Sequence, residues 1–349
     1  MIDIEFLKKH GYVVVNVLTR EEADDHKINL VKELEDLYGG EFDSTIPDTT
    51  SNRFAAKRGG MEQHLGVGHL NTSYEIRSHP KIRNTWAELW DLEPTAKTAT
   101  DIGPALLSSI DGVCHSPAPE NLRKTLATHR MRIADDPTLD SNKRNNWLHL
   151  DQTKRGFQCY QGFVTLEDIE EEDATVVFIE GSHLKHDEFM DEVESTGRKF
   201  KGNWFLFDEE HVEWFTDRAH EIVQVEMNKG DMVIWDSRLV HQGSYPKRGR
   251  KVIRDRTVVY ISMAPVSMCS KADLKKKQNI FWSGDSTSHW PHKNIKAFPY
   301  MPRLWGPTPE CVEERYEIYK ERKREKLGPS NIDKLTDTQK RLMGIMEYP

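Results

Sequence analysis

The chain has 349 residues, 37% of them hydrophobic, which is enough apolar material to bury a substantial core in one large domain or two smaller ones. The formal net charge of −8 argues against sequence-independent binding of nucleic acid, because counterion release requires a basic face. No stretch approaches the roughly twenty apolar residues that cross a bilayer. We therefore expect neither a nucleic-acid nor a membrane partner.

The cysteines and the N-terminus indicate the compartment. Cys114, Cys159, Cys269 and Cys311 are widely separated, which fits neither a disulfide framework nor a structural zinc site. The first residues lack a basic region followed by an apolar run, so a secretory signal is not indicated. We expect a cytoplasmic protein with reduced thiols. The sequence leaves the oligomeric state open and is compatible with a monomer.

The first hundred residues are expected to be mainly helical. Residues 12–17 are rich in valine and predict a strand. Thr19 and Glu22 then have the spacing of a capping box, which predicts the start of a helix that continues to about Tyr38. A second helix is expected over about 81–92, where apolar residues recur at helical spacing.

From about residue 104 the pattern changes to short β-prone runs separated by Gly, Pro and Asp. Many short strands with turn residues between them predict a closed barrel or jelly roll. We therefore predict one domain over 1–349, mainly β with flanking helices (α+β): a mainly helical part over 1–100, a double-stranded β-helix core over about 104–265 and a helical C-terminal extension over 266–349. The runs expected to form strands are 106–113, 128–133, 156–166, 175–179, 222–225, 231–235 and 257–263, and a charged surface helix is expected over about 310–327.

His149 and Asp151 form the most informative pair in the chain. One residue separates them, so in an extended segment both side chains leave the same face and can chelate one ion. His241 lies just past the expected strand 231–235, and in a jelly roll it can face the first pair across the barrel mouth. Two imidazoles and one carboxylate leave adjacent metal positions free, which a non-heme Fe(II) centre needs to hold a co-substrate and O2. The three residues therefore indicate oxidative metal chemistry.

The same spacing occurs by chance. With 15 histidines, one or two such His-x-acid matches are expected at random. His186 with Glu188 and His211 with Glu213 have this spacing, but their acidic surroundings lack β alternation and predict solvated surface pairs. Without further context, His149 held by a turn aspartate is as good an interpretation as a metal site.

That context is a resemblance to the phytanoyl-CoA dioxygenase-like family of Fe(II)/2-oxoglutarate oxygenases. Residues 166–183 resemble the family's acidic turn and strand followed by Pro-Gly-Ser-His. Ala174 and Glu180 depart from the usual Gly and Pro, and neither position holds metal. Further segments similar to one branch of these enzymes are 107–113, 287–291 and 302–306.

The resemblance implies specific roles. His149, Asp151 and His241 would be the facial triad on Fe(II), with 2-oxoglutarate and O2 as co-substrates. Halogenating relatives replace the acid with a small residue, so the aspartate argues against halogenation. In the family an arginine after the distal histidine binds the far carboxylate of 2-oxoglutarate, a role that the planar guanidinium suits. The candidates are Arg250, Arg254 and Arg256, of which Arg256 is preferred because it opens the last core strand; Arg254 has the same strand parity, and Ser244 is a candidate hydroxyl for the same carboxylate.

The expected reaction is oxidation of a C–H bond of a small, carboxylated or amino-acid-like metabolite, with release of succinate and CO2. Hydroxylation and the oxidative cyclisation or desaturation of natural-product biosynthesis are both compatible with this chemistry. Alternatives are an acyl-CoA or lipid hydroxylase of the same family, a cupin-like metal hydrolase, and a non-catalytic jelly-roll binding protein. Candidate substrate contacts, chosen because they lie near the metal pair in sequence, are Arg130, Arg132, Trp147, Gln158 and Gln161.

Two of these interpretations stay open. Arg130 and Arg132 alternate on one expected strand and would present two cations to an acidic substrate, but a solvent-facing strand edge is equally compatible. The aromatic segment between His183 and Ile222 is either a lid over the substrate or a surface helix pair with its own hydrophobic cluster.

Overall fold

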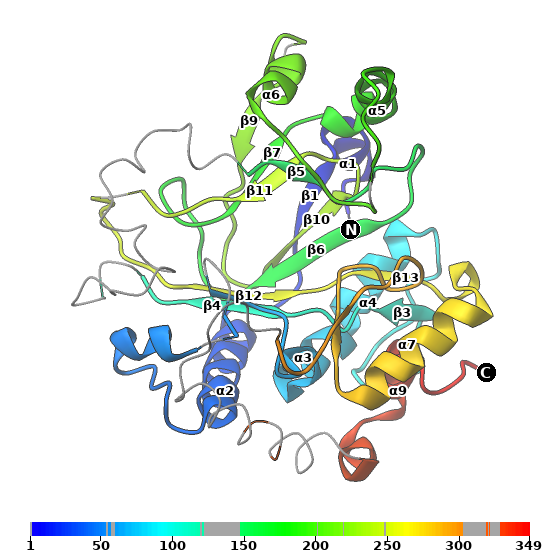
Figure 1. The fold of residues 1–349 in the computed structure, drawn as a ribbon. Coiled ribbons are helices and arrows are strands. Elements are labelled where there is room, and N and C mark those ends of the chain that lie inside the picture. The colour runs from blue at the N-terminus through cyan, green and yellow to red at the C-terminus, as the bar shows by residue number, and fades with distance from the viewer. Residues whose placement is uncertain are drawn as a thin grey trace.

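Two antiparallel sheets form the centre of the protein (Figure 1). The computed structural model describes residues 2–53, 55–56, 60–118, 121, 147–200, 202–218, 220–247, 249–302, 319, 321 and 329–349. The larger sheet has the strand order β1-β10-β6-β12-β4-β2, and the smaller sheet has the order β8-β5-β11-β7-β9. The strands of the larger sheet are β1 (Tyr12–Asn16), β2 (Met61–Glu62), β4 (Val113–Ser116), β6 (Tyr160–Thr165), β10 (Asp231–Asp236) and β12 (Arg256–Tyr260). Those of the smaller sheet are β5 (His149–Leu150), β7 (Val176–Ile179), β8 (Phe205–Leu206), β9 (Ile222–Gln224) and β11 (His241–Gly243).

Side-chain alternation along β10 explains why both faces of the larger sheet are buried. Val233 and Trp235 point between the two sheets, where the Trp235 ring lies 5.6 Å from that of Phe178 on β7. Met232 and Ile234 leave the opposite face and join the core beneath the helices. Because successive residues of a strand point to opposite faces, one apolar strand supplies both layers. The expected double-stranded β-helix core with flanking helices is confirmed.

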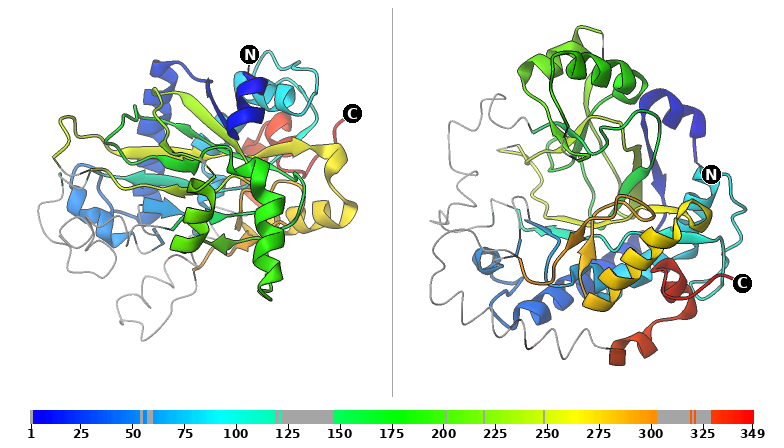
Figure 2. Two further views of the ribbon diagram at one scale, coloured as in Figure 1. Left: turned by 90° about the horizontal axis from the view of Figure 1, so that it is seen from above. Right: turned by 45° about the vertical axis from the view of Figure 1, so that its right-hand side comes forward.

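Helices cover the outer faces of both sheets (Figures 1 and 2). The predicted capping box is present: the Thr19 hydroxyl accepts a hydrogen bond from the Glu22 amide, and the Thr19 amide donates to the Glu22 carboxylate at 2.8 Å. The helix that follows packs with α3 and α4 on the larger sheet, where Trp86 is fully buried. The helices are α1 (Ile4–His10), α2 (Arg20–Tyr38), α3 (Asn71–Ser78), α4 (Pro80–Leu89), α5 (His186–Ser195), α6 (Glu209–Thr216), α7 (Lys271–Ser283) and α9 (Asp337–Leu342).

The segment between residues 183 and 222 forms α5 and α6 with a cluster of their own. Phe189, Phe207 and Phe215 pack against apolar residues of the smaller sheet. The segment also contributes β8, which pairs with β5 and which the sequence pattern did not reveal. The expected helix pair is therefore observed, but its hydrophobic cluster is shared with the smaller sheet. The interpretation of this segment as a lid stays a prediction.

Shorter elements complete the part of the chain that the structure describes. The run 106–113 divides into β3 (Leu106–Ser108), which pairs with β13 (Met263–Pro265), and the start of β4. The C-terminal part contains a hairpin of β14 (Ser286–Thr287) and β15 (Ala297–Phe298) in addition to its helices. The expected strand 128–133 lies outside the described residues, and so does the expected helix 310–327 except for residues 319 and 321. Short 3-10 helices occur at Pro47–Asn52, Val67–His69, Ser182–Lys185, Val266–Met268 and Pro329–Lys334.

The helices and the cysteines bear on the expectations drawn from composition. None of the helices placed there combines the length and apolar character needed to cross a bilayer. Cys114, Cys159 and Cys269 are free thiols in the described part of the chain, and Cys311 lies outside it.

Lys277 on α7 is buried, and its ammonium donates a hydrogen bond to the main-chain oxygen of Ser108. Burial lowers the pKa of Lys277 from 10.5 to about 7. Between these values the unfolded chain holds a proton that the folded chain lacks, so this group makes the free energy of unfolding rise by about 1 kcal/mol per pH unit. We expect Lys277→Met to remove that rise in urea unfolding curves measured from pH 7 to 9.

The exposed neighbour on the same helix provides the control. Lys275→Met should show the same rise in the free energy of unfolding between pH 7 and 9 as the wild-type protein, because it removes an exposed lysine of the same helix and leaves Lys277 in place. If the free energy of unfolding rose equally with pH in the wild-type protein and in Lys277→Met, the lowered pKa of Lys277 would be contradicted.

Candidate active site

His149 on β5 and His241 on β11 face each other across two adjacent strands. They are direct partners in the antiparallel register, and their ring centroids lie 4.3 Å apart. The Nδ1 atom of His149 is 3.0 Å from the main-chain oxygen of Trp147, and that of His241 is 2.9 Å from the oxygen of Leu239. These hydrogen bonds place the proton on Nδ1, so the Nε2 lone pair of each ring is available to a metal.

Asp151 follows β5 and directs its carboxylate toward both rings. Its Oδ2 atom lies 3.3 Å from Nε2 of His241 and 3.7 Å from Nε2 of His149. Burial acts to raise the pKa of Asp151, but the imidazoles of His289 and His149 lower it well below its usual value. Burial also lowers the pKa of His241, which favours the neutral, ligating form of this ring.

These three residues fit a ferrous ion. One ligand atom from each of His149, Asp151 and His241 lies within 4.8 Å of the other two. An ionised carboxylate and two imidazole nitrogens on one side of an ion form the donor set of non-heme iron oxygenases and leave the other side open. The arrangement agrees with the sequence expectation that a His-x-Asp pair and a distant histidine converge.

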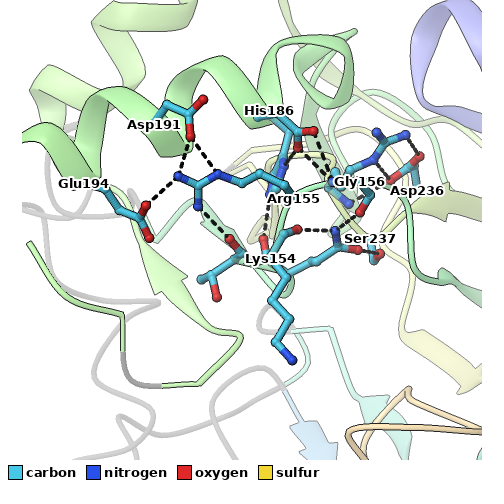
Figure 3. Close-up of polar contacts among 12 residues, drawn as sticks. Lys154, Arg155, Gly156, His186, Asp191, Glu194, Asp236 and Ser237 are labelled. Carbon is cyan, nitrogen blue, oxygen red and sulfur yellow. Dashed lines mark hydrogen bonds and ion pairs between the residues drawn. The ribbon is translucent and has the colours of Figure 1, made fainter.

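The loop after Asp151 is fixed by polar contacts (Figure 3). The Gln152 side-chain amide donates to the main-chain oxygens of Lys154 and Gly156 at 2.6 and 2.5 Å, and its oxygen accepts from the Ser237 hydroxyl at 2.6 Å. The main-chain oxygen of Gln152 lies 2.8 Å from Nε2 of His186. His186 is therefore buried, and the expectation of a solvated surface pair at this position is wrong.

A second set of contacts ties the same loop to α5. Arg155 donates to Asp191 at 2.7 Å and to Glu194 at 2.8 Å, as Figure 3 shows. The side chain of Lys154 extends away from this network and lines the cavity described next. The carboxylate of Asp151 thus stands between a strand and an anchored loop, which restricts its movement.

A cavity of about 980 Å³ opens onto the three residues. Trp147 stacks on His149 with ring centroids 4.9 Å apart, and the ring of Trp204 is tilted against the same imidazole at a centroid distance of 6.0 Å. Gln161 is buried in the cavity wall, and its Nε2 atom has no hydrogen-bond partner among the described residues. Of the predicted substrate contacts, Trp147 and Gln161 line the cavity and Gln158 does not, whereas Arg130 and Arg132 lie outside the described residues.

Arg256 brings a cation to this cavity. The side chain is half-buried, with its guanidinium 5.7 Å from the ring of Phe163 and its Nη1 atom 3.6 Å from Sγ of Cys114. Its Nε atom is buried without a hydrogen-bond partner, and no carboxylate within the described residues pairs with the guanidinium. A guanidinium that is partly withdrawn from water and has no anionic partner leaves part of its desolvation cost uncompensated, so the position favours an anionic ligand.

The other candidate arginines are occupied by acidic side chains. Arg254 forms ion pairs with Glu170 at 2.8 Å and Asp173 at 3.1 Å, and Arg250 pairs with Asp173 at 2.6 Å. Neither of these arginines lines the cavity. Ser244 does line it, and its hydroxyl accepts a hydrogen bond from the amide of Thr175 at 3.1 Å.

Several cavity residues were not singled out from the sequence. His289 lies with Nδ1 3.9 Å from Oδ2 of Asp151, and burial lowers its pKa to about 4. The similarity of residues 287–291 to relatives was the one sequence signal for this position. Lys154, Lys276 and Lys296 also line the cavity without having been singled out, and they come from separate parts of the chain, whereas Trp204 belongs to the aromatic segment that the sequence offered as a lid.

Known proteins resemble this chain in sequence and fold. The sequence profile described as Phytanoyl-CoA dioxygenase (PhyH) matches residues 134–254. Ava biosynthesis cluster protein O of Aspergillus versicolor is 25% identical over 300 residues, which are 83% of this chain and 85% of that protein. The crystal structure of GlcNAc Inducible Gene 2 from Candida albicans has a TM-score of 0.54 at 14% identity, covering 99% of this chain and 76% of that one. The epimerase SnoN, solved with Fe3+, alpha ketoglutarate and nogalamycin RO, has a TM-score of 0.44 at 16% identity, covering 75% and 82%.

The double-stranded β-helix and the His-Asp-His site define an iron- and 2-oxoglutarate-dependent oxygenase. The match over residues 134–254 includes His149, Asp151 and His241. The resemblance to the phytanoyl-CoA dioxygenase family that the sequence motifs indicated is thereby confirmed.

Proposed function

We propose that this enzyme oxidises a C–H bond of a small, carboxylated or amino-acid-like metabolite by hydroxylation, oxidative cyclisation or desaturation. His149, Asp151 and His241 hold Fe(II) in this proposal, and Arg256 binds the far carboxylate of 2-oxoglutarate. The observation that carries it is the convergence of the three ligand atoms in a cavity that also contains a guanidinium without a carboxylate partner among the described residues.

Each chain residue has a defined task in this reaction. The cross-strand histidines and Asp151 hold the ion from one side, and Arg256 orients the co-substrate through two parallel hydrogen bonds. The indole of Trp147 covers the His149 ring and keeps water from that side of the centre. The bound iron and 2-oxoglutarate supply the oxidising power that removes a hydrogen atom from the substrate, with release of succinate and CO2.

The charged lining of the cavity supports an anionic substrate. Lys154, Lys276 and Lys296 reach it from the loop after Asp151, from α7 and from the β14–β15 hairpin. Within the described part of the chain, none of these lysines forms an ion pair. Aromatic rings, among them Trp204 and Trp290, form much of the remaining wall. An organic skeleton that carries a carboxylate matches both features.

The name of the Aspergillus versicolor relative supports the placement in natural-product biosynthesis. That protein is named for a biosynthesis cluster, and it aligns with 83% of this chain. The cyclising and desaturating outcomes of radical oxidation are therefore part of the proposal alongside hydroxylation.

Paired substrates test the proposed class. Purified enzyme with Fe(II) and 2-oxoglutarate is incubated with carboxylated and amino-acid-like metabolites, with their methyl esters and with fatty acyl-CoAs, while succinate release is measured. We expect turnover coupled to free acids, and a loss of about tenfold or more in kcat/KM for the matched ester, because the ester cannot pair with the lysines. Raising the salt concentration should increase KM for the acid but not for the ester. Succinate release coupled only to acyl-CoA or to apolar lipids would refute the proposed substrate class.

A further inference from the structure

His289 stands beside the candidate metal centre without a role in the arrangement described so far. Its Nδ1 atom lies 3.9 Å from Oδ2 of Asp151, the carboxylate oxygen that both triad histidines approach. Its Nε2 atom is buried and has no hydrogen-bond partner among the described residues. An imidazole in such a place has a polar edge that no described neighbour satisfies, which is uncommon in folded proteins.

His289 does not belong to the group of ligand atoms that converge on one position. The ligand atoms that all lie within 4.8 Å of one another come from His149, Asp151 and His241, and those of His289 fall outside this group. Metal–nitrogen bonds of about 2.1 Å place neighbouring ligand atoms roughly 3 Å apart, so a fourth ligand would lie within the group. His289 therefore approaches the carboxylate rather than the metal position.

The hairpin that carries His289 is anchored on the core. The Thr287 amide donates to the main-chain oxygen of Ile110 at 2.7 Å, and the Ile110 amide donates to the Thr287 hydroxyl at 2.8 Å. The Ser288 amide donates across the hairpin to the oxygen of Lys296 at 2.9 Å. These bonds fix the main chain on both sides of the imidazole, so its approach to Asp151 is built into the fold.

We propose that His289 is a positioning residue that donates a hydrogen bond from Nδ1 to the Asp151 carboxylate and so holds this ligand in place. The C-terminal hairpin thereby completes the metal centre from outside the double-stranded β-helix. A rotation of either side chain that shortens the present separation by about 1 Å gives the hydrogen bond. Partners of this kind orient ligating groups, and their removal costs roughly 10- to 100-fold in metal affinity.

This inference rests on the proposed function, and metal affinity tests it without turnover. Co(II) is titrated into the full-length protein in the absence of substrate, and its visible absorption gives the dissociation constant and the coordination spectrum. We expect His289→Ala to weaken Co(II) binding by about 10- to 100-fold and to change the spectrum. His289→Asn should restore most of the affinity, because its amide N–H occupies the place of Nδ1.

His292 provides a matched control. It lies in the same hairpin, is fully buried and lacks hydrogen-bond partners for both ring nitrogens among the described residues, but it does not line the cavity. His292→Ala should bind Co(II) as the wild-type protein does. Circular dichroism melting curves establish that each variant is folded before titration.

The outcomes separate the two hypotheses. Unchanged Co(II) affinity in His289→Ala, or a rise only in the KM of the primary substrate, would overturn the positioning role and leave the metal centre intact. Equal, weak binding by the wild-type protein and by His149→Ala would overturn the proposed function and this inference with it.

Discussion

Replacing His149 with alanine is expected to reduce O2 and 2-oxoglutarate consumption to the level seen without iron. The substitution removes one of the three proposed ligands. It leaves Asp151 and His241, whose Oδ2 and Nε2 atoms lie 3.3 Å apart. Two ligands do not define the face of an octahedral ion on which a keto acid and O2 must lie side by side. An oxygen electrode and a succinate assay on the purified variant measure the effect.

His211→Ala is the matched control for this experiment. His211 belongs to the competing His-x-Glu pair on α6, and the structure places it against the aromatic cluster of that helix instead of the cavity. Its loss should leave O2 consumption close to the wild-type rate. Activity that persists under argon with zinc, and that His149→Ala removes, would instead indicate a hydrolase.

Arg256→Gln is expected to raise the KM for 2-oxoglutarate by about a hundredfold. Losing one partner of a buried, hydrogen-bonded charge pair costs roughly 2–5 kcal/mol, which corresponds to factors from about 30 to several thousand. Arg256→Lys keeps the charge but not the planar pair of donors, so its KM should lie between those of wild type and Arg256→Gln. Initial rates over a range of 2-oxoglutarate concentrations, and equilibrium dialysis under argon, separate binding from turnover.

Arg254→Gln distinguishes this assignment from its nearest competitor. Arg254 is paired with Glu170 and Asp173 away from the cavity, so its loss should leave the KM for 2-oxoglutarate unchanged. A hundredfold effect in Arg254→Gln together with a normal KM in Arg256→Gln would reverse the assignment of the two arginines.

The choice between these arginines shows where sequence reasoning reaches its limit. Strand parity places Arg254 and Arg256 on the same face, so the preference for Arg256 depended only on its place at the start of the expected strand. The acidic turn that contains Glu170 and Asp173 separates them in space, and it lies more than 80 positions away in sequence. Only the folded chain brings that turn to Arg254 and leaves Arg256 in the cavity.

Predictions from local sequence patterns were correct where the structure depends on residues that are close in the sequence. The capping box at Thr19 and the single-residue spacing of His149 and Asp151 depend on neighbours within a few positions, and both appear as expected. The prediction of a solvated surface position for His186 was wrong because this side chain is buried against the main chain of Gln152, 34 positions away, to which it is hydrogen-bonded. His289 was overlooked for the same reason. Asp151 follows β5 and His289 follows β14, and no periodic pattern in the sequence links the two residues.

The register that pairs His149 with His241 gives the centre a form that does not depend on the metal. The backbone ladder sets the spacing of the two rings, and the carbonyls of Trp147 and Leu239 set their rotation. Little conformational freedom is left for an arriving ion to remove. We therefore expect the two imidazoles to keep their positions when no metal is bound, so that Fe(II) can bind again after its loss without refolding of the chain.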